Sequence, residues 1–560
     1  MDRRDLAAIF VLALLARVAV AAFQSHPGYM DAYYYTVGAQ RLVEGLGFTE
    51  PYVWNYLDDP TSLPRPSHLY WMPLPSILAA ASMTIFGSSY HAAQVPFVLL
   101  ASLVPLIAYT IARRATSQRR AAWIAALLAI FSGFYVPFWG VPESFAPYAV
   151  FGSLALLLAG AGRSKRASFA AGVCAGLAHL TRADGALLLI PVLLSNAELR
   201  MQNAELRMKN VELRMKNVEL RRQNVEKRSG FLHSSFFILH SLLAVLAGYL
   251  VITLPWFARN VAVVGAPISP AGTRALWLCN YDELFSFGIS LDASHWLSCG
   301  VDRIVATKLG AAWSGLVHLI AENGLIFLAP LMAVGLWRLR RERLFRPAIG
   351  YLVLLYLAMT LVFTFVGERG GLFHSSAALT PFLCAAAPIG LETIVGVVAR
   401  RRRTWTAATA NRVFSVSLVA LAAIFSAAIA WGRVIGSDWS RADAAYREVG
   451  AWLVGQGDTD SIVMAGNPPG FTYHTGHPSI MIPNGDVDTL LLAAQRFGAQ
   501  WLVLDSNRPV PLAVLYADPQ SDARLKLRAT LAGTLLFEIH QQQTLPQVMT
   551  PVESAVWPHK

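Results

Sequence analysis

Long apolar segments recur along this chain, and most of them end in a cluster of basic residues. Leu6–Phe23 follows the basic start MDRRD, His91–Ala112 runs into RRATSQRR, and Ala377–Val398 runs into ARRRR. A helix that crosses a bilayer needs about 20 mostly apolar residues, and positive charge collects at its cytoplasmic end. The pattern therefore predicts a polytopic α-helical membrane protein.

Composition supports this class and argues against two others. Only 14% of the 560 residues are charged, whereas 55% are hydrophobic. A soluble domain carries roughly 25% charged residues, so this chain cannot cover a water-facing surface of its size. The net charge of +12 would favour nucleic acid in a soluble protein. Here the basic residues form short clusters beside apolar runs, which indicates membrane topology and no nucleic-acid partner.

The apolar runs alternate across the membrane as about eleven transmembrane helices within residues 1–435, and every basic cluster then falls on the cytoplasmic side, which checks the count. The other expected spans are Ala121–Trp139, Phe145–Ala161, Phe169–Leu180, Ala186–Leu194, Phe236–Trp256, Leu325–Trp337, Tyr351–Phe365 and Val413–Trp431. The N-terminus is then cytoplasmic, the protein lies in the cell membrane, and external loops occupy 24–90 and 258–321. Within the first loop, Trp71–Phe86 is apolar but short and contains prolines, so we expect an interfacial or re-entrant segment.

The composition changes at residues 436–560, which the topology places outside the membrane. Short apolar runs at Ser461–Ala465, Ser479–Ile482 and Trp501–Leu504 are typical of strands, and Asp488–Phe497 has a helical pattern between two of them. This alternation predicts a small extracytoplasmic α/β domain.

One segment, residues 196–229, repeats NAELRMK-like units with a period of seven. One interpretation is a cytoplasmic coiled coil that binds a partner. The other is a helical spacer produced by local duplication in a tolerant loop. The near-identity of the units, with Leu outside the apolar stripe, favours the spacer.

Four cysteines exclude a disulfide scaffold and a CxxC metal site. Cys174 and Cys384 lie in apolar runs, whereas Cys279 and Cys299 share an expected external loop, where the sequence leaves a disulfide open. No Walker loop, GxGxxG unit or HExxH pair is present. Since nucleotide donors are cytoplasmic, a donor used by an external site would have to be carried by a lipid.

Two external carboxylates are candidates for acid–base chemistry. Asp31 follows the first span in HPGYMDAYYYTVG, and Glu143 lies in the external turn WGVPESFAPY. Asp31 is suited to a general base facing a lipid-borne substrate, or it caps a helix beside an aromatic belt. Glu143 would hold a hydroxyl or a metal, or it would favour a helix start. The sequence leaves both pairs of interpretations open.

Basic residues on the external side are unusual, because Lys and Arg concentrate in cytoplasmic loops, so a bound anion would explain them. Arg259 in LPWFARN, Arg369 in GERGGLFH and the nearby His374 would pair with a phosphate-bearing ligand. Pairing of these cations with Glu368 or with lipid headgroups is the alternative. Arg182, at the break LTRADG between two short spans, would face the cavity, or Asp184 would neutralise it.

These stretches together resemble the integral-membrane glycosyltransferases of the C-type fold, a set that includes protein O-mannosyltransferases and lipid A aminoarabinose transferases. The resemblance rests on MDAYYYTVGAQRLVEGLGF, YWMPLPSILAAASMTIFG, LTRADG, LPWFARNVAVVGAP and ERGGLFHSSAALTPF, in that order. Some relatives carry an acidic–basic pair just before the prolines of the second stretch. This chain has Tyr70, Trp71 and Met72 there, which puts the donor-phosphate contacts and the sugar identity in doubt.

The resemblance implies a polyprenyl-phosphate-linked sugar donor and an extracytoplasmic acceptor, with inversion at the sugar carbon. Asp31 matches the position of the base, and Glu143 is the second catalytic candidate. Arg259, Arg369, His374 and Arg182 are the expected phosphate ligands, and Tyr34, Tyr35 and His68 the expected substrate contacts. We expect no cofactor, although a divalent metal is left open. A flippase of lipid-linked sugar and a non-catalytic scaffold are the alternatives; the spans show no internal repeat of the kind transporters often have.

Overall fold

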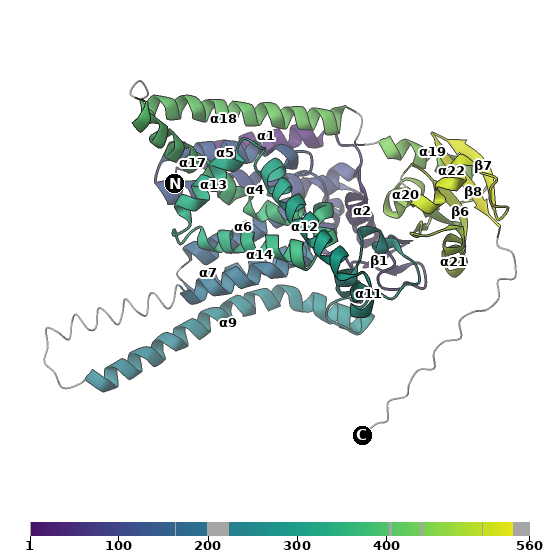
Figure 1. Ribbon diagram of the computed structural model, residues 1–560, viewed down its shortest axis with the longest axis horizontal. Helices are drawn as coiled ribbons and strands as arrows, with labels where there is room; N and C mark the ends of the chain where they lie inside the picture. The colour runs from purple at the N-terminus through teal and green to yellow at the C-terminus, as the bar shows by residue number, and fades with distance from the viewer. Residues whose placement is uncertain are drawn as a thin grey trace.

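The computed structural model describes residues 2–162, 164–198, 223–402, 406–436, 439, 441–506 and 508–540. It is a helical bundle with a small sheet domain at one end (Figure 1). The repeat at 196–229 lies largely outside the described residues, so the coiled-coil and spacer interpretations both remain predictions.

Helices form at the segments where the sequence predicts spans. The bundle contains α1 (Arg3–Ala21), α4 (Tyr90–Thr116), α5 (Arg119–Ile130), α6 (Phe145–Ala161), α7 (Lys165–Thr181), η2 (Ala183–Leu188), α9 (Gln223–Val264), α13 (Ala329–Leu339), α14 (Arg346–Leu361), α17 (Thr380–Arg401) and α18 (Ala407–Ala430). Between α14 and α17 lie the short turns α15 (Thr364–Val366), η6 (Gly367–Gly371), α16 (Leu372–Ser376) and η7 (Ala377–Leu379). Within the described ranges, five helical segments are long and apolar enough to cross a membrane. The full count of about eleven remains a prediction.

Local sequence explains where these helices begin and how closely they pack. The side chains of Asp2 and Ser89 accept hydrogen bonds from the first amides of α1 and α4. Gly172 of α7 faces the backbone of α9, where an added Cβ would lie 1.9 Å from the carbonyl oxygen of Val245. Such small residues let membrane helices approach each other closely.

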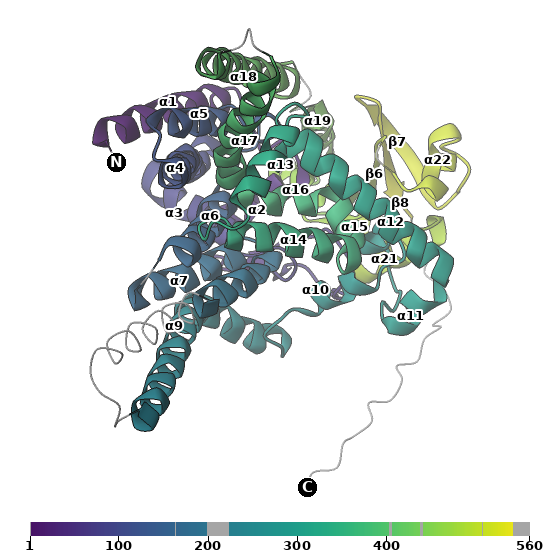
Figure 2. The same cartoon turned by 60° about the vertical axis from the view of Figure 1, so that its left-hand side comes forward.

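The second external loop is shorter than the expected range 258–321. α9 continues to Val264, and α12 (Val301–His318) occupies the end of that range. With the π-helical turn η5 (Leu319–Asn323), α12 forms one of the five apolar segments, and its mean hydropathy of 1.4 is the lowest among them. The sequence pattern hid this helix because its first three turns contain an Asp, an Arg and a Lys. α12 packs beside α14 (Figure 2).

Short turns build what remains of this loop: α10 (Pro270–Arg274), η3 (Ala275–Trp277), η4 (Tyr281–Phe285) and α11 (Ala293–Ser298). A disulfide joins Cys279 to Cys299, with the two Cα atoms 6.0 Å apart, so the pairing that the sequence left open is formed. Cys384 is buried and Cys174 half-buried, both as free thiols.

The first external loop contains α2 (Met30–Val43), β1 (Thr49–Glu50), β2 (Tyr52–Val53), β3 (Arg65–Pro66) and α3 (Leu74–Phe86). α2 follows α1 directly and carries Asp31 in its first turn. α3 has 13 residues, which are too few to span a bilayer as a single helix. Its length therefore agrees with the interfacial or re-entrant expectation.

The C-terminal part forms the predicted α/β domain from α19 (Arg441–Gly455), β4 (Ile462–Ala465), α20 (Pro468–Thr475), β5 (Ser479–Met481), α21 (Val487–Phe497), β6 (Ala499–Leu504), α22 (Ala513–Ala517), β7 (Leu525–Leu531) and β8 (Thr534–Ile539). The three predicted strands and the predicted helix are confirmed. The sheet order is β2-β5-β4-β6-β8-β7, with β5, β4 and β6 parallel and the hairpin β7–β8 antiparallel.

One strand of this sheet comes from outside the C-terminal part. β2 belongs to the first external loop and pairs in parallel with β5, Tyr52 opposite Ser479 and Val53 opposite Ile480. The domain is therefore not built from residues 436–560 alone, and it shares its edge with the loop that carries Asp31.

Candidate active site

Three titratable side chains from distant parts of the sequence meet beside α2. They are Asp31 in the first turn of α2, Glu143 two residues before α6, and His374 in α16. One ligand atom of each lies within 4.8 Å of those of the other two. The two carboxylates that the sequence analysis weighed separately thus belong to one site.

Glu143 is fixed by its neighbours and is only 1% exposed. The hydroxyl of Ser144 donates to its Oε1 at 2.6 Å, and Nδ1 of His374 lies 3.2 Å from the same oxygen. The ring of Phe145 stacks on His374 with a centroid distance of 4.1 Å. Burial acts to raise the pKa of Glu143, but the interactions with His374 and Ser144 outweigh it and hold this pKa below its usual range. Glu143 is therefore an ionised, positioned carboxylate.

The pKa of Asp31 is shifted in the opposite direction. Burial of the carboxylate, assisted by the negative charge of Glu143, raises its pKa to about 6, against the opposing charges of His374 and Arg182. Within the described part of the chain, Asp31 forms no hydrogen bond or ion pair with another side chain. A carboxylate with a pKa near neutrality and no side-chain partner is suited to accept a proton from a bound group.

Arg182 lies beside this pair, at the point where α7 ends in extended geometry (φ −149°, ψ 138°). Its Nε donates to Asp184 at 3.1 Å and to the hydroxyl of Ser375 at 3.0 Å, and Ser375 also donates to Asp184. The charge of Arg182 acts on both Asp31 and Glu143. Asp184 pairs with Arg182, as one interpretation of the LTRADG break expects, while the cavity-facing interpretation stays a prediction.

Arg369 lies in η6, next to Gly370, which takes a positive φ of 111°. Its guanidinium lies 5.1 Å from the ring of Tyr281 in η4. Burial and the charge of Asp31 raise the pKa of Tyr281 to about 12, and Arg369 opposes that shift, so these residues share one electrostatic environment. Among the described residues, Arg369 pairs with no carboxylate, Glu368 included. Its charge remains available to an anionic ligand.

Arg259 lies in a different environment, at the junction of α9 and the first external loop. It donates to the backbone carbonyls of Phe48 at 3.3 Å and Ser67 at 2.9 Å, and to the side chain of Asn260 at 3.1 Å. Its guanidinium also lies 4.7 Å from the ring of Trp256. The structure thus gives this expected phosphate ligand a set of protein partners that pins the loop to α9.

Tyr34 and Tyr35 of α2 pack with His68 in a buried aromatic core. His68 is 2% exposed, packs between these tyrosines, Phe48 and Trp256, and donates its amide to the hydroxyl of Tyr34 at 2.6 Å. Burial lowers the pKa of His68 to about 3, so the imidazole is neutral. All three side chains are buried, and Tyr35 lies within the electrostatic range of Asp31, Glu143 and Arg182, so their contact with substrate stays a prediction.

Several residues near the site were missed by the sequence analysis. Tyr281 and Tyr70 both lie within the electrostatic range of Asp31, and Ser375 completes the contacts of Arg182. Lys308 of α12 donates to Thr364, just before η6. Tyrosines and serines in loops carry little signal of their own, and the charged residues at the start of α12 interrupt the apolar pattern that would place Lys308 on a helix.

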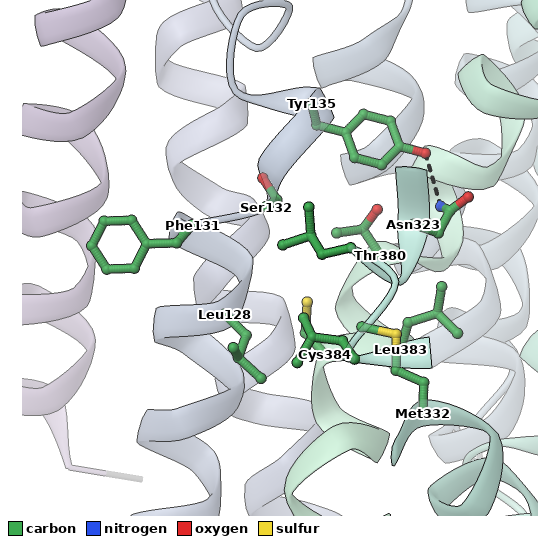
Figure 3. A pocket seen from close by; sticks show the side chains of 11 residues that line it. Leu128, Phe131, Ser132, Tyr135, Asn323, Met332, Thr380, Leu383 and Cys384 are labelled. Carbon is green, nitrogen blue, oxygen red and sulfur yellow. Dashed lines mark hydrogen bonds between the residues drawn. The ribbon is translucent and has the colours of Figure 1, made fainter. Parts of the chain in front are cut away.

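A pocket lies between α5, η1 (Gly133–Tyr135), η5 and α17, with Tyr135 and Asn323 at its polar side (Figure 3). It is small and is lined by Leu128, Phe131, Ser132, Tyr135, Asn323, Leu325, Leu328, Met332, Thr380, Leu383 and Cys384. Tyr135 accepts a hydrogen bond from Asn323 at 3.0 Å and donates to the backbone carbonyl of Phe373 at 2.8 Å. Tyr135 thus fixes the backbone next to His374, and the mainly apolar cavity lies behind it.

The donor atoms of Asp31, Glu143 and His374 suit a divalent metal ion, because two carboxylates and one imidazole form a ligand set that Zn²⁺ and related ions accept. A second group, Cys279, His295 and Cys299, is also close enough to be considered. There the disulfide engages both thiols, so the acidic site is the better candidate.

Comparison with known proteins identifies the fold. The sequence profile of the dolichyl-phosphate-mannose-protein mannosyltransferase family matches residues 65–207. No curated protein matches the sequence significantly. The profile covers the segment from β3 through α7, which includes Glu143 and Arg182.

Solved structures match over almost the whole chain. ArnT from Cupriavidus metallidurans bound to undecaprenyl phosphate is 14% identical, with a TM-score of 0.56 over 96% of this chain and 98% of that chain. The same protein in the apo state gives 13% identity and a TM-score of 0.54 with the same coverage. The oligosaccharyltransferase of Archaeoglobus fulgidus, tethered with an acceptor peptide, is 14% identical, with a TM-score of 0.50 over 90% of this chain and 69% of that chain. The chain has the C-type glycosyltransferase fold that the sequence resemblance predicted.

Proposed function

We propose that this protein is a membrane glycosyltransferase that moves a sugar from a polyprenyl-phosphate carrier to an acceptor outside the membrane. The observation that carries the proposal is the pair Asp31 and Glu143, two neighbouring carboxylates with opposite pKa shifts. The fold supports it, since the matching ArnT structure is bound to undecaprenyl phosphate.

In the proposed reaction, Asp31 removes the proton from an acceptor hydroxyl or amine. The acceptor atom then forms a bond to C1 of the sugar, on the face opposite the lipid phosphate. The bond between C1 and the phosphate oxygen breaks, and its electron pair leaves with the polyprenyl phosphate. The configuration at C1 is therefore inverted. Glu143, held ionised by His374, helps to keep the pKa of Asp31 high enough for proton transfer.

Charge that develops on the leaving phosphate needs nearby cations. Arg369 fits this role because its guanidinium pairs with no carboxylate among the described residues and lies beside Tyr281, which interacts with Asp31. Arg182 adds a second fixed positive charge on the same site. Nδ1 of His374 contacts Glu143. Nε2 on the other side of the ring lies near Gly370, the residue after Arg369. We assign these three residues to the donor phosphate.

The sugar is a hexose or a pentose, and the acceptor is a lipid, a glycan or a protein. No cofactor is needed for the displacement itself. A divalent ion on Asp31, Glu143 and His374 would occupy the base, so we favour the metal-free role for Asp31. The flippase alternative has no observation in its favour, because the titratable groups gather at one site suited to bond chemistry.

Sugar transfer in membrane vesicles tests the proposal. Labelled polyprenyl-phosphate hexoses and pentoses are supplied with native lipid, glycan and protein extracts, and wild type is compared with Asp31→Asn. The matched control is Asp302→Asn, an exposed aspartate of α12. Transfer in wild type and control, reduced by about a hundredfold or more in Asp31→Asn, supports the assignment. Equal transfer in all three removes Asp31 as the base.

A further inference from the structure

The helix that carries Asp31 is held by the C-terminal domain through a buried polar cluster. Tyr33 of α2 donates its hydroxyl proton to Asp443 of α19 at 2.5 Å, and His474 of α20 donates to the same hydroxyl at 2.9 Å. His474 also lies 3.3 Å from Asp443, so the three side chains close a triangle. Tyr33 is two residues from Asp31, within one turn of α2.

This cluster is buried, and its charge depends on its partners. Tyr33 and Asp443 are each 1% exposed, and the side chain of His474 is 4% exposed. Burial acts to raise the pKa of Asp443, but the bonds from His474 and Tyr33 outweigh it and the net pKa is lowered. A buried ionised carboxylate is costly unless such partners remain, so loss of Tyr33 or His474 weakens the contact between the domain and α2.

A second contact fixes the chain just before α2. The indole of Trp439 donates to the backbone carbonyl of His26 at 2.9 Å and packs against Tyr29 with a centroid distance of 5.8 Å. Gly28 takes a positive φ of 84°, and a Cβ there would lie 2.5 Å from the Trp439 ring. Only glycine permits this approach. The start of α2 is thus held from both sides of Asp31.

A third contact holds the chain after α2. β2 pairs with β5, the amide of Ser479 donates to the carbonyl of Pro51 at 3.2 Å, and the hydroxyl of Tyr56 donates to the carbonyl of Met481. The segment from residue 26 to residue 56 is therefore attached to the C-terminal domain before, within and after α2.

We propose that the C-terminal domain positions the catalytic base, with Tyr33, Asp443 and His474 as positioning residues that never touch the substrate. The inference rests on the function proposed for Asp31. A displacement of about 1 Å at a reacting group can cost about a hundredfold in rate. Since Tyr33 and Asp31 share a helical turn, loosening of the cluster moves the carboxylate relative to Glu143 and to the acceptor.

The test uses the full-length protein in nanodiscs with three mild substitutions, Tyr33→Phe, Asp443→Asn and His474→Gln. The matched control is Asp458→Asn, because Asp458 lies 3.8 Å from His477 in the same domain without contacting α2. Hydrogen exchange of the α2 amides is measured without substrate, and kcat, donor KM and the pH profile are measured in the transfer assay.

We expect the α2 amides to exchange about tenfold faster or more in Tyr33→Phe and Asp443→Asn, with wild-type exchange in Asp458→Asn. In the same two variants, kcat falls by about tenfold or more while donor KM changes little, and the acid limb of the pH profile moves. A purely structural role would lower the amount of active protein but leave the acid limb in place.

Unchanged α2 exchange in both Tyr33→Phe and Asp443→Asn overturns the positioning role, whatever their activity. Faster exchange with wild-type kcat and an unmoved acid limb overturns it too, because the helix is then loosened without consequence for Asp31. Absence of transfer by wild type counts against the proposed function instead, and the exchange measurement still decides whether the cluster holds α2.

Discussion

Nδ1 of His374 lies 3.2 Å from Oε1 of Glu143, and this contact separates the roles of the two carboxylates at the site. Glu143 has its pKa lowered by this imidazole, whereas the pKa of Asp31 is raised to about 6. One carboxylate is thus a fixed negative charge, and the other can exchange a proton near neutral pH.

The first prediction concerns pH. A base with a pKa of about 6 is deprotonated above that value, so kcat/KM should be high at neutral pH and fall tenfold per unit below pH about 6. Glu143→Gln removes a negative charge that raises the pKa of Asp31, so the acid limb should move to lower pH. A pH profile of transfer for wild type and variant measures both. An unmoved acid limb in Glu143→Gln would show that Asp31 does not control it.

The second prediction concerns the donor phosphate. Arg369→Ala should raise donor KM by about tenfold or more, since a charge-assisted hydrogen bond contributes roughly 1.5–3 kcal/mol. Saturation curves with the lipid-linked donor measure this. Arg303→Ala, an exposed arginine of α12, is the control and should bind donor as wild type does. Equal donor KM in both variants would remove Arg369 from the phosphate site.

The third prediction tests whether Arg259 stabilises the fold or binds the donor phosphate. Its guanidinium is bonded to the carbonyls of Phe48 and Ser67, so Arg259→Ala should lower the thermal unfolding temperature by several degrees. Donor KM should change less than in Arg369→Ala. Thermal unfolding in detergent and donor saturation measure the two effects. A large rise in donor KM with unchanged unfolding would restore Arg259 as a phosphate ligand.

The fourth prediction concerns metal. If Asp31 acts as a free base, extensive dialysis against a chelator should leave transfer within about twofold of its starting rate. Metal analysis of the dialysed protein accompanies the assay. If dialysis abolishes transfer, Zn²⁺ or Mn²⁺ restores it in wild type, and neither ion restores it in Glu143→Gln, an ion is bound by the three-residue cluster.

The repeat at residues 196–229 yields a fifth prediction. Its deletion should leave transfer largely intact, because the duplication is expected to be a spacer. Vesicle transfer and membrane insertion are measured side by side. Lost activity with normal insertion would favour the partner-binding coiled coil.

Local patterns predicted much of this fold. Apolar runs with basic ends located the bundle helices, and short alternating runs located β4, β5, β6 and α21. α12 was missed because charged residues interrupt its apolar pattern. β2 was missed because a strand of two residues has no detectable alternation.

The sequence predicts individual residues of the site but does not predict that they lie together. Asp31, Glu143, Arg182 and His374 each stand in the sequence as titratable groups next to apolar spans. Their meeting depends on how α2, α6, α7 and α16 pack, which no local pattern encodes. The bond between Tyr33 and Asp443 joins two ends of the chain, and neither residue carries a signal of its own.

The pairing of β2 with β5 also sets an order of events during synthesis. The edge strand at Tyr52–Val53 emerges early, but its partner at Ser479–Met481 is made only after the bundle through α18 has been translated. Contacts so distant in sequence close late. The loop that carries Asp31 therefore keeps an uncovered strand edge until β5 has been made, and a chain that stops before β5 leaves that edge open to pairing with another molecule.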